Sequence, residues 1–225
     1  MNKLLSGICF SLLLLSINFA ADPLFSQDLQ WKKARGKFYL IDSCGKRISK
    51  KHFDAANQFF DFMYSTSVRK RGRWGAINRE GVLIVPCKYD DVDCYTIPYP
   101  YNVIMEMPPV HHLIICQNLN GGNKSHFVYN LNGELLFSGD YDSVQNLLYG
   151  YLYCSKEDYD LLVSIKTKKG VRFDNKYNLM PYTNGKFVII NRDSLQSKYG
   201  IVDTTGAFIQ PCIYNSYEEV VKFLE

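Results

Sequence analysis

Two adjacent histidines are the residues of this 225-residue chain whose type best suits acid–base or metal chemistry. They are His111 and His112, and Glu106 is the nearest acidic residue in the sequence. Neighbouring residues of a strand point to opposite faces, so this pair cannot chelate one ion from one strand. We expect a structural role for the pair, with an enzyme or inhibitor site near His111–His112 as the alternative.

An acidic cluster follows Tyr89 and offers oxygen ligands for a cation. It consists of Asp90, Asp91 and Asp93, but a calcium loop requires more oxygen ligands at regular spacing. The sequence also has no G-x-S-x-G motif and no phosphate-cradling glycine loop. We therefore expect no metal site, no cofactor and no enzymatic activity.

Seven cysteines bear on the redox compartment, and one of them, Cys9, lies near the N-terminus. The others are Cys44, Cys87, Cys94, Cys116, Cys154 and Cys212. They include no CxxC pair and no Cys/His spacing typical of zinc. Disulfides and free buried thiols are both compatible with this pattern, and the sequence selects no pairing.

Residues 1–21 have the pattern of a secretory signal peptide. Lys3 precedes an apolar run, and the small residues Ala20 and Ala21 suit cleavage. The sequence thus predicts an exported protein, periplasmic or extracellular, with no stable membrane span after cleavage. An uncleaved membrane anchor is the alternative, although the apolar run is short for a span.

The charge balance is weakly basic, with 26 Lys and Arg against 22 Asp and Glu. The densest basic cluster is Arg69–Arg71 together with Arg73. We interpret it as a solvated strand end rather than a phosphate site, and we expect no nucleic-acid partner.

A repeated unit organises the chain from residue 22 to residue 225, which we treat as one domain. Turn glycines recur at intervals of 36, 52, 37 and 36 residues, at Gly45, Gly81, Gly133, Gly170 and Gly206. An aromatic residue follows each glycine by eight residues, or by seven in the fourth copy, and Asp or Asn comes next. These aromatics, which we expect to pack between units, are Phe53, Tyr89, Tyr141, Tyr177 and Tyr214. Such a period indicates tandem repeats.

Two copies share further residues. They open with Trp74–Gly75 and Tyr199–Gly200, and their second strands close with Pro86–Cys87 and Pro211–Cys212. The segments RWGAINREG and KYGIVDTTG, each followed by Pro-Cys-x-Tyr, resemble WG repeats, in a bacterial exported type of protein. The resemblance implies a tandem β-repeat scaffold, with Trp74 and Tyr199 in the repeat core, and it supplies no catalytic residue set.

Strand, tight turn and strand follow one another in each copy, which predicts an all-β fold. We expect tandem β-hairpin repeats, about five copies, that form a curved open array. The alternative is a closed five-bladed propeller-like ring, in which Leu24–Lys33 would complete the last unit.

The long interval between Gly81 and Gly133 predicts an insertion at residues 95–112. Its candidate binding residues are Tyr95, Tyr99, Tyr101, His111 and His112. Exposed aromatics with polar tips suit protein interfaces and sugar stacking, whereas a loop folded over the sheet would bury its own tyrosines. We expect a non-enzymatic exported binding module for a protein or glycan, with a purely structural envelope component as the alternative.

Overall fold

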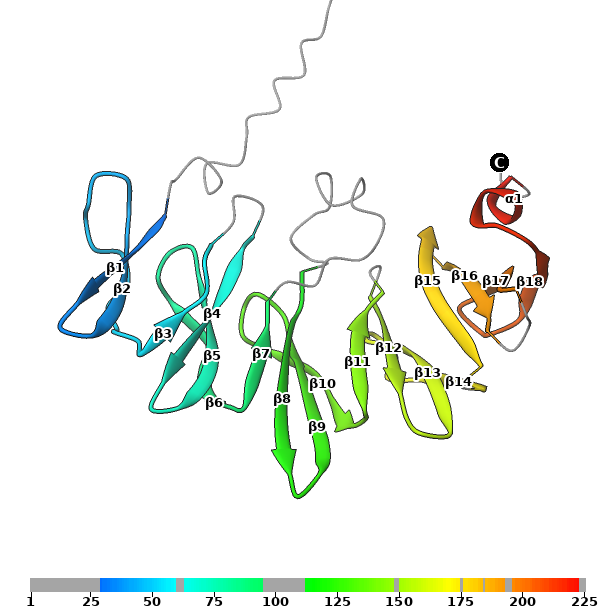
Figure 1. Ribbon diagram of the computed structural model, residues 1–225, viewed down its shortest axis with the longest axis horizontal. Coiled ribbons are helices and arrows are strands. Elements are labelled where there is room, and N and C mark those ends of the chain that lie inside the picture. Colours follow the sequence, from blue (N-terminus) through cyan, green and yellow to red (C-terminus); the bar gives the residue numbers. More distant parts are fainter. Residues whose placement is uncertain are drawn as a thin grey trace, which may run out of the picture.

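The computed structural model describes residues 29–59, 63–94, 112–147, 150–174, 176–183, 185–192 and 196–222. Within these ranges the chain is almost entirely β-structure, arranged as consecutive antiparallel sheets (Figure 1). Each strand pairs with the strand next to it in the sequence, so every sheet is a meander. This local pairing is what tandem hairpin repeats predict.

The first sheet has two strands and the other four have four strands each. The strands of the first two sheets are β1 (Gln30–Ala34) and β2 (Lys37–Ile41), then β3 (Ala55–Ala56), β4 (Ser65–Lys70), β5 (Arg73–Asn78) and β6 (Leu83–Tyr89). The third sheet contains β7 (Asp91–Asp93), β8 (Ile114–Asn120), β9 (Asn123–Tyr129) and β10 (Leu135–Asp140). The fourth contains β11 (Ser143–Asn146), β12 (Tyr151–Ser155), β13 (Tyr159–Ser164) and β14 (Gly170–Asp174). The last contains β15 (Tyr177–Thr183), β16 (Lys186–Asn191), β17 (Lys198–Asp203) and β18 (Phe208–Tyr214), and the short helix α1 (Tyr217–Val221) follows it.

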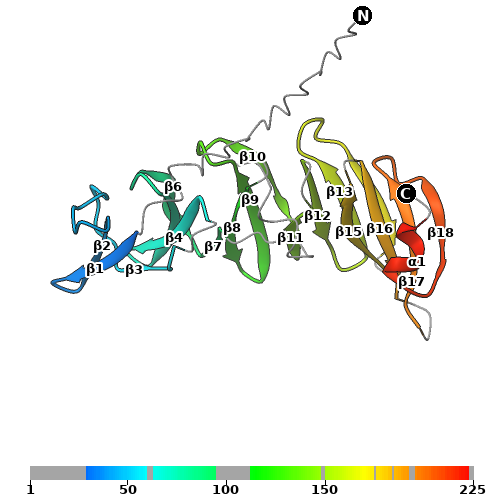
Figure 2. The ribbon, with the colours of Figure 1, turned by 90° about the horizontal axis from the view of Figure 1, so that it is seen from above.

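The sheets succeed one another along an open arc. β1 and β2 lie at one end, and β18 with α1 lies at the other (Figure 1), while the view from above shows an elongated molecule (Figure 2). β1 pairs with β2 in full register and not with β18. The predicted open array is therefore confirmed, and the closed ring is wrong, because the strand that would have closed it belongs to the first sheet.

Four of the predicted turns share one hydrogen-bonding pattern. Their glycines have φ between 75° and 81°, a conformation that glycine adopts without strain. In each turn the side chain of an Asp or Asn accepts from the backbone N–H four residues later, as Asn78 does from Val82 at 2.8 Å. The equivalent acceptors are Asp42, Asn130 and Asp203. The side chain thus fixes the turn that the glycine permits.

The fourth copy departs from this pattern. Ser164 replaces the Asp or Asn, and Lys168 rather than a glycine takes the positive φ, at 59°. Gly170 is the first residue of β14, so it is not a turn glycine. Because the turn is shifted, the register sets Phe173 opposite Asp160, four residues before Ser164. In the second sheet Tyr89 lies opposite Trp74, which is likewise four residues before the turn residue Asn78. Phe173, which is 7% exposed, therefore occupies the repeated aromatic position that the sequence predicted for Tyr177.

Most clusters of the hydrophobic core lie between neighbouring sheets, and one lies between the last sheet and α1. One cluster joins Ala76, Val85 and Tyr89 of the second sheet to Ile114 and Tyr129 of the third. Phe53 and Tyr89 are fully buried, at 0% and 1% exposure. The other predicted core aromatics are partly buried against such clusters: Trp74, Tyr141, Tyr177, Tyr199 and Tyr214. Each sheet is thus stabilised mainly by its neighbours, as in a solenoid.

Candidate functional site

The predicted binding residues fall at the edge of the described structure. Tyr95, Tyr99, Tyr101 and His111 lie outside the described residues, so their role stays a prediction. His112 is described, just before β8, and its ring lies edge-on to that of Tyr64 with centroids 4.7 Å apart. His112 is thereby held against the loop that leads into β4.

The insertion enlarges one connection that is short in the other sheets. The connection between β7 and β8 covers residues 94–113, whereas the corresponding connections cover 57–64, 147–150 and 184–185. All of them join the first and second strands of a four-stranded sheet, so the order of the described strands is the same with the longer connection.

A cavity of about 470 Å³ lies where the chain enters the insertion. It is formed by the second and third sheets together, with β4 on one side and β7 on the other. Its lining residues are Asn57, Gln58, Met63, Thr66, Ser67, Val92, Asp93 and Cys94. A concave site of this size with both apolar and polar walls suits a small group such as a sugar ring or a side chain of a partner.

The polar wall of this cavity is held in place by internal hydrogen bonds. The Asn57 side-chain amide donates to the Ser67 hydroxyl at 2.7 Å, and the Thr66 hydroxyl donates to the Asn57 carbonyl oxygen at 3.1 Å. The Trp31 indole N–H donates to the same carbonyl oxygen at 2.8 Å. The wall therefore has a fixed orientation, which lowers the entropic cost of binding a ligand.

Cys94 lines this cavity as a partly buried thiol. Burial raises the pKa of the Cys94 thiol to about 12, and a hydrogen bond with Ser65 offsets this only in part. The thiol therefore stays protonated at neutral pH, and the thiolate is the reactive form. All six cysteines among the described residues are free in the structure. In the same part of the chain, no group of three or more His, Cys, Asp or Glu is placed to hold a metal ion.

We expect the cysteines of the folded protein to react very unequally with a disulfide thiol reagent at pH 8. Cys44 is exposed and should react at once. Burial raises the pKa of Cys154 to about 12 and also raises that of Cys116, and both side chains are buried, so these two should react only after denaturation. Peptide mapping of the labelled protein measures this, and labelling of Cys154 as fast as Cys44 would contradict the burial described here.

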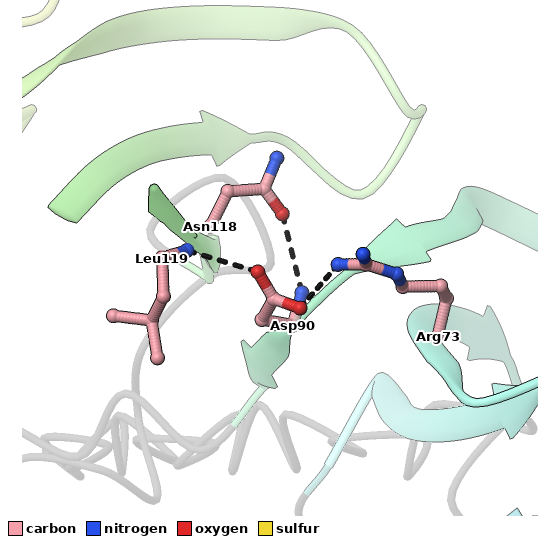
Figure 3. A network of polar contacts seen from close by, with 4 residues as sticks. All are labelled: Arg73, Asp90, Asn118 and Leu119. Atoms are coloured by element: carbon pink, nitrogen blue, oxygen red, sulfur yellow. Dashed lines mark hydrogen bonds and ion pairs between the residues drawn. The ribbon is translucent and has the colours of Figure 1, made fainter. Parts of the chain in front are cut away.

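An aspartate bridge links the second and third sheets (Figure 3). Asp90 forms an ion pair with Arg73 on β5, and its other carboxylate oxygen accepts from the Leu119 N–H on β8 at 2.9 Å. Its own N–H donates to the Asn118 side-chain oxygen at 3.2 Å. One side chain therefore fixes the position of one sheet against the next.

The bridge recurs along the array. Lys37 pairs with Asp54, and Lys198 donates to Asn215, with the same separation of 17 residues as Arg73 and Asp90. Asp54 also accepts from the Arg71 N–H of the next sheet at 2.6 Å. The structure shows that in the first two bridges the Asp that follows the repeated aromatic joins adjacent sheets. The constant spacing of 17 residues is the sequence signal for this contact.

Replacing Asp90 with alanine should lower the free energy of unfolding by roughly 1 kcal/mol, since the side chain is partly exposed and makes one ion pair and one backbone hydrogen bond. Asp90→Asn should lower the free energy of unfolding by less than half this amount, because Asn215 accepts the equivalent hydrogen bond from Lys198 in the last copy. Urea unfolding measures both variants. An unchanged stability of the alanine variant would show that the bridge adds nothing to the contact between sheets.

The aromatic–glycine and Pro–Cys pairs meet across adjacent strands. A Cβ atom at Gly75 would lie 2.4 Å from the Val85 carbonyl oxygen and 2.8 Å from the Cys87 nitrogen. Gly200 faces Gln210 and Cys212 in the same way, at 2.7 and 2.9 Å. In both pairs the register shifts beside the glycine. Each glycine therefore leaves room for a bulge that carries the Pro–Cys pair.

A family model described as WG containing repeat matches residues 74–96, from Trp74 across the bulge and β7. The chain contains a WG repeat. The geometry accounts for both letters of the motif, because the Trp74 ring packs against the core cluster between two sheets and Gly75 admits the bulge.

Among curated proteins, no match to this chain was found. Among solved structures, the nidogen/laminin complex has a chain with a TM-score of 0.36 and 7% identity, over 85% of this chain and 80% of that one. A eukaryotic initiation factor gives a TM-score of 0.27 and 13% identity, over 82% of this chain and 63% of that one. The fold assignment rests on the strand pairing and the repeat motif.

Proposed function

We propose that this WG-repeat protein is a non-enzymatic binding module that contacts a protein or glycan through the insertion at residues 95–112. The observation that carries the proposal is the cavity of about 470 Å³ between the second and third sheets, at the residues where the chain enters the insertion. A ligand held by the insertion would thus meet a preformed wall of the scaffold.

The chemistry of the wall favours binding over catalysis. Asn57, Thr66 and Ser67 bond to one another, so they present oriented amide and hydroxyl groups rather than a proton-transfer pair. The Cys94 thiol beside them stays protonated because burial raises its pKa to about 12. Amide and hydroxyl groups, together with the Asp93 carboxylate, lie beside the apolar side chains of the cavity, and such a lining suits a sugar or a peptide segment.

We further propose that the protein is exported to the periplasm or the extracellular space. The basis is the signal-peptide pattern of residues 1–21, which lie outside the described residues. In the part of the chain that the structure describes, no helix is both long and apolar enough to cross a membrane.

A capture experiment tests the binding role. The chain from residue 22 onward and a variant with residues 98–109 replaced by a short Gly/Ser linker are each used to capture components of an envelope extract of the source organism. A second variant, with the exposed turn residues 166–168 replaced by the same linker, is the matched control, since that turn belongs to another sheet. Circular dichroism verifies that all three retain β-structure.

A protein or glycan held by the intact chain and by the turn variant, but lost by the insertion variant, would support the proposal. Equal capture by all three would transfer binding to the faces of the repeats. The absence of any captured component would favour a purely structural envelope protein.

A further inference from the structure

Two arginine-bearing hairpin tips flank a second cavity at the opposite ends of the strands. Thr66 and Ser67, near the start of β4, line the cavity beside the insertion, whereas Lys70 at the end of β4 lines this one. Its volume is about 570 Å³, and its lining residues are Ala34, Arg35, Lys37, His52, Asp54, Lys70 and Arg71. It therefore lies between the β1–β2 and β4–β5 hairpins at the N-terminal end of the arc (Figure 1).

A smaller cavity of about 340 Å³ shares Lys70 and Arg71 and adds the further cations Lys51 and Arg73. The basic cluster that the sequence suggested was a solvated strand end thus borders two adjoining hollows. Since the two hollows share lining residues, one extended ligand can contact cations of both.

We infer that the cleft between the Arg35–Gly36 and Arg71–Gly72 hairpin tips binds a ligand that carries two or more phosphate groups. The inference is independent of the proposed function, because it concerns different residues at the other ends of the strands.

The backbone at both tips is the first argument. Arg35 and Arg71 have φ of 49° and 53°, in the left-handed region that bulky side chains avoid. Two-residue hairpin tips prefer Asn, Asp or Gly at this position, and the β8–β9 tip of the third sheet has Gly121–Gly122. Arginine at both tips beside the cavity is therefore unfavourable for the turn, and such local strain is typical of functional positions.

The uncompensated charge is the second argument. Asp54, the one carboxylate among the described lining residues, already forms the ion pair with Lys37 and accepts from the Arg71 N–H. Within the part of the chain that the structure describes, the side chains of Arg35, Lys70 and Arg71 form no ion pair. These three cations consequently face the cavity without a counter-charge.

The chemistry of the lining selects the ligand class. Guanidinium groups match phosphate oxygens with paired hydrogen bonds, and a single phosphate would leave most of this space and charge unused. Among the described residues that line the cavity there is no Trp, Tyr or Phe to stack a nucleobase, and the His52 ring already lies edge-on to Tyr39 at 6.0 Å. Phosphate groups without base recognition are therefore favoured over single-stranded nucleic acid.

Titration calorimetry with inorganic tripolyphosphate tests the inference on the chain from residue 22 onward. The variant carries Arg35→Asn and Arg71→Asn, since asparagine tolerates positive φ and should keep or raise the thermal midpoint. Lys168→Asn is the matched control, because it removes a cation at a positive-φ turn away from the cavity. We expect this double variant to bind about a hundredfold more weakly, which is about tenfold for each arginine, and the control to leave binding unchanged.

Two further probes identify the source of the phosphate and the competing ligand class. If the protein cosediments with cardiolipin vesicles and tripolyphosphate abolishes this cosedimentation, a lipid headgroup is supported as the source of the phosphate. If the protein binds tripolyphosphate but not the vesicles, a soluble ligand is supported. Tripolyphosphate that fails to bind at millimolar concentration, or binds the double variant equally, would overturn the inference. A thymidine oligonucleotide that binds more tightly than an abasic strand of equal length would overturn it as well, in favour of nucleic acid.

Discussion

Replacing Gly75 with alanine is expected to destabilise the protein by about 1–3 kcal/mol or more, because the added methyl group overlaps backbone atoms. Its Cβ would lie 2.4 Å from the Val85 carbonyl oxygen and 2.8 Å from the Pro86 carbonyl carbon. A backbone neighbour cannot rotate away as a flexible side chain can, so the bulge between β5 and β6 must shift. Urea unfolding measures the loss.

Gly170→Ala is the matched control for this experiment. The nearest atom to a Cβ at Gly170 is a Val163 methyl carbon at 3.6 Å, and Gly170 is not a positive-φ residue. We expect this variant to be as stable as the original protein. Equal stability of Gly75→Ala would show that the bulge can relax and that the glycine of the motif is not required by packing.

Truncating Tyr89 to alanine should cost about 3–5 kcal/mol, which rivals the effect of Gly75→Ala. The side chain is 1% exposed, its ring lies 5.2 Å from that of Phe127, and its hydroxyl shares a hydrogen bond with the buried Tyr129 hydroxyl. The variant leaves a cavity between the second and third sheets, so both sheets should lose stability. Thermal unfolding measures the effect, and an unchanged melting temperature would remove Tyr89 from the core.

Tyr89→Phe separates the ring from the hydroxyl. It keeps the packing and removes one hydrogen bond, so we expect a loss of roughly 1–3 kcal/mol, since the buried Tyr129 hydroxyl loses its partner. The double variant with Tyr129→Phe should recover part of this loss, because no unpaired hydroxyl remains. A fully additive double variant would contradict a direct bond between the two hydroxyls.

Local features of the fold could be predicted from the sequence. Gly81 and Asn78 specify their turn through backbone and side-chain geometry within four residues, and Trp74–Gly75 and Pro86–Cys87 meet within one hairpin. The fourth turn was mispredicted because Ser164 and Lys168 make a turn of different length without a glycine. Because the turn was placed at Gly170, the repeated aromatic of the fourth copy was assigned to Tyr177 instead of Phe173.

Contacts between sheets were harder to predict. Asp90 meets Leu119 across 29 residues, and no local rule relates these positions. The basic cleft joins Arg35 and Arg71, which are separated by one repeat interval of 36 residues, so a search for dipeptides at the repeat spacing would have found both tips. Residues 95–111 of the insertion lie outside the described structure, and the proposal for them rests on the neighbouring cavity.

Small-angle X-ray scattering of the chain from residue 22 onward tests the open array most directly. A compact domain of about 200 residues has a radius of gyration of roughly 16 Å. An open arc whose first and last sheets do not meet predicts a clearly larger radius and an asymmetric distance distribution with a long tail. A radius near the compact value with a symmetric distribution would mean that the ends meet, and the open array would be wrong.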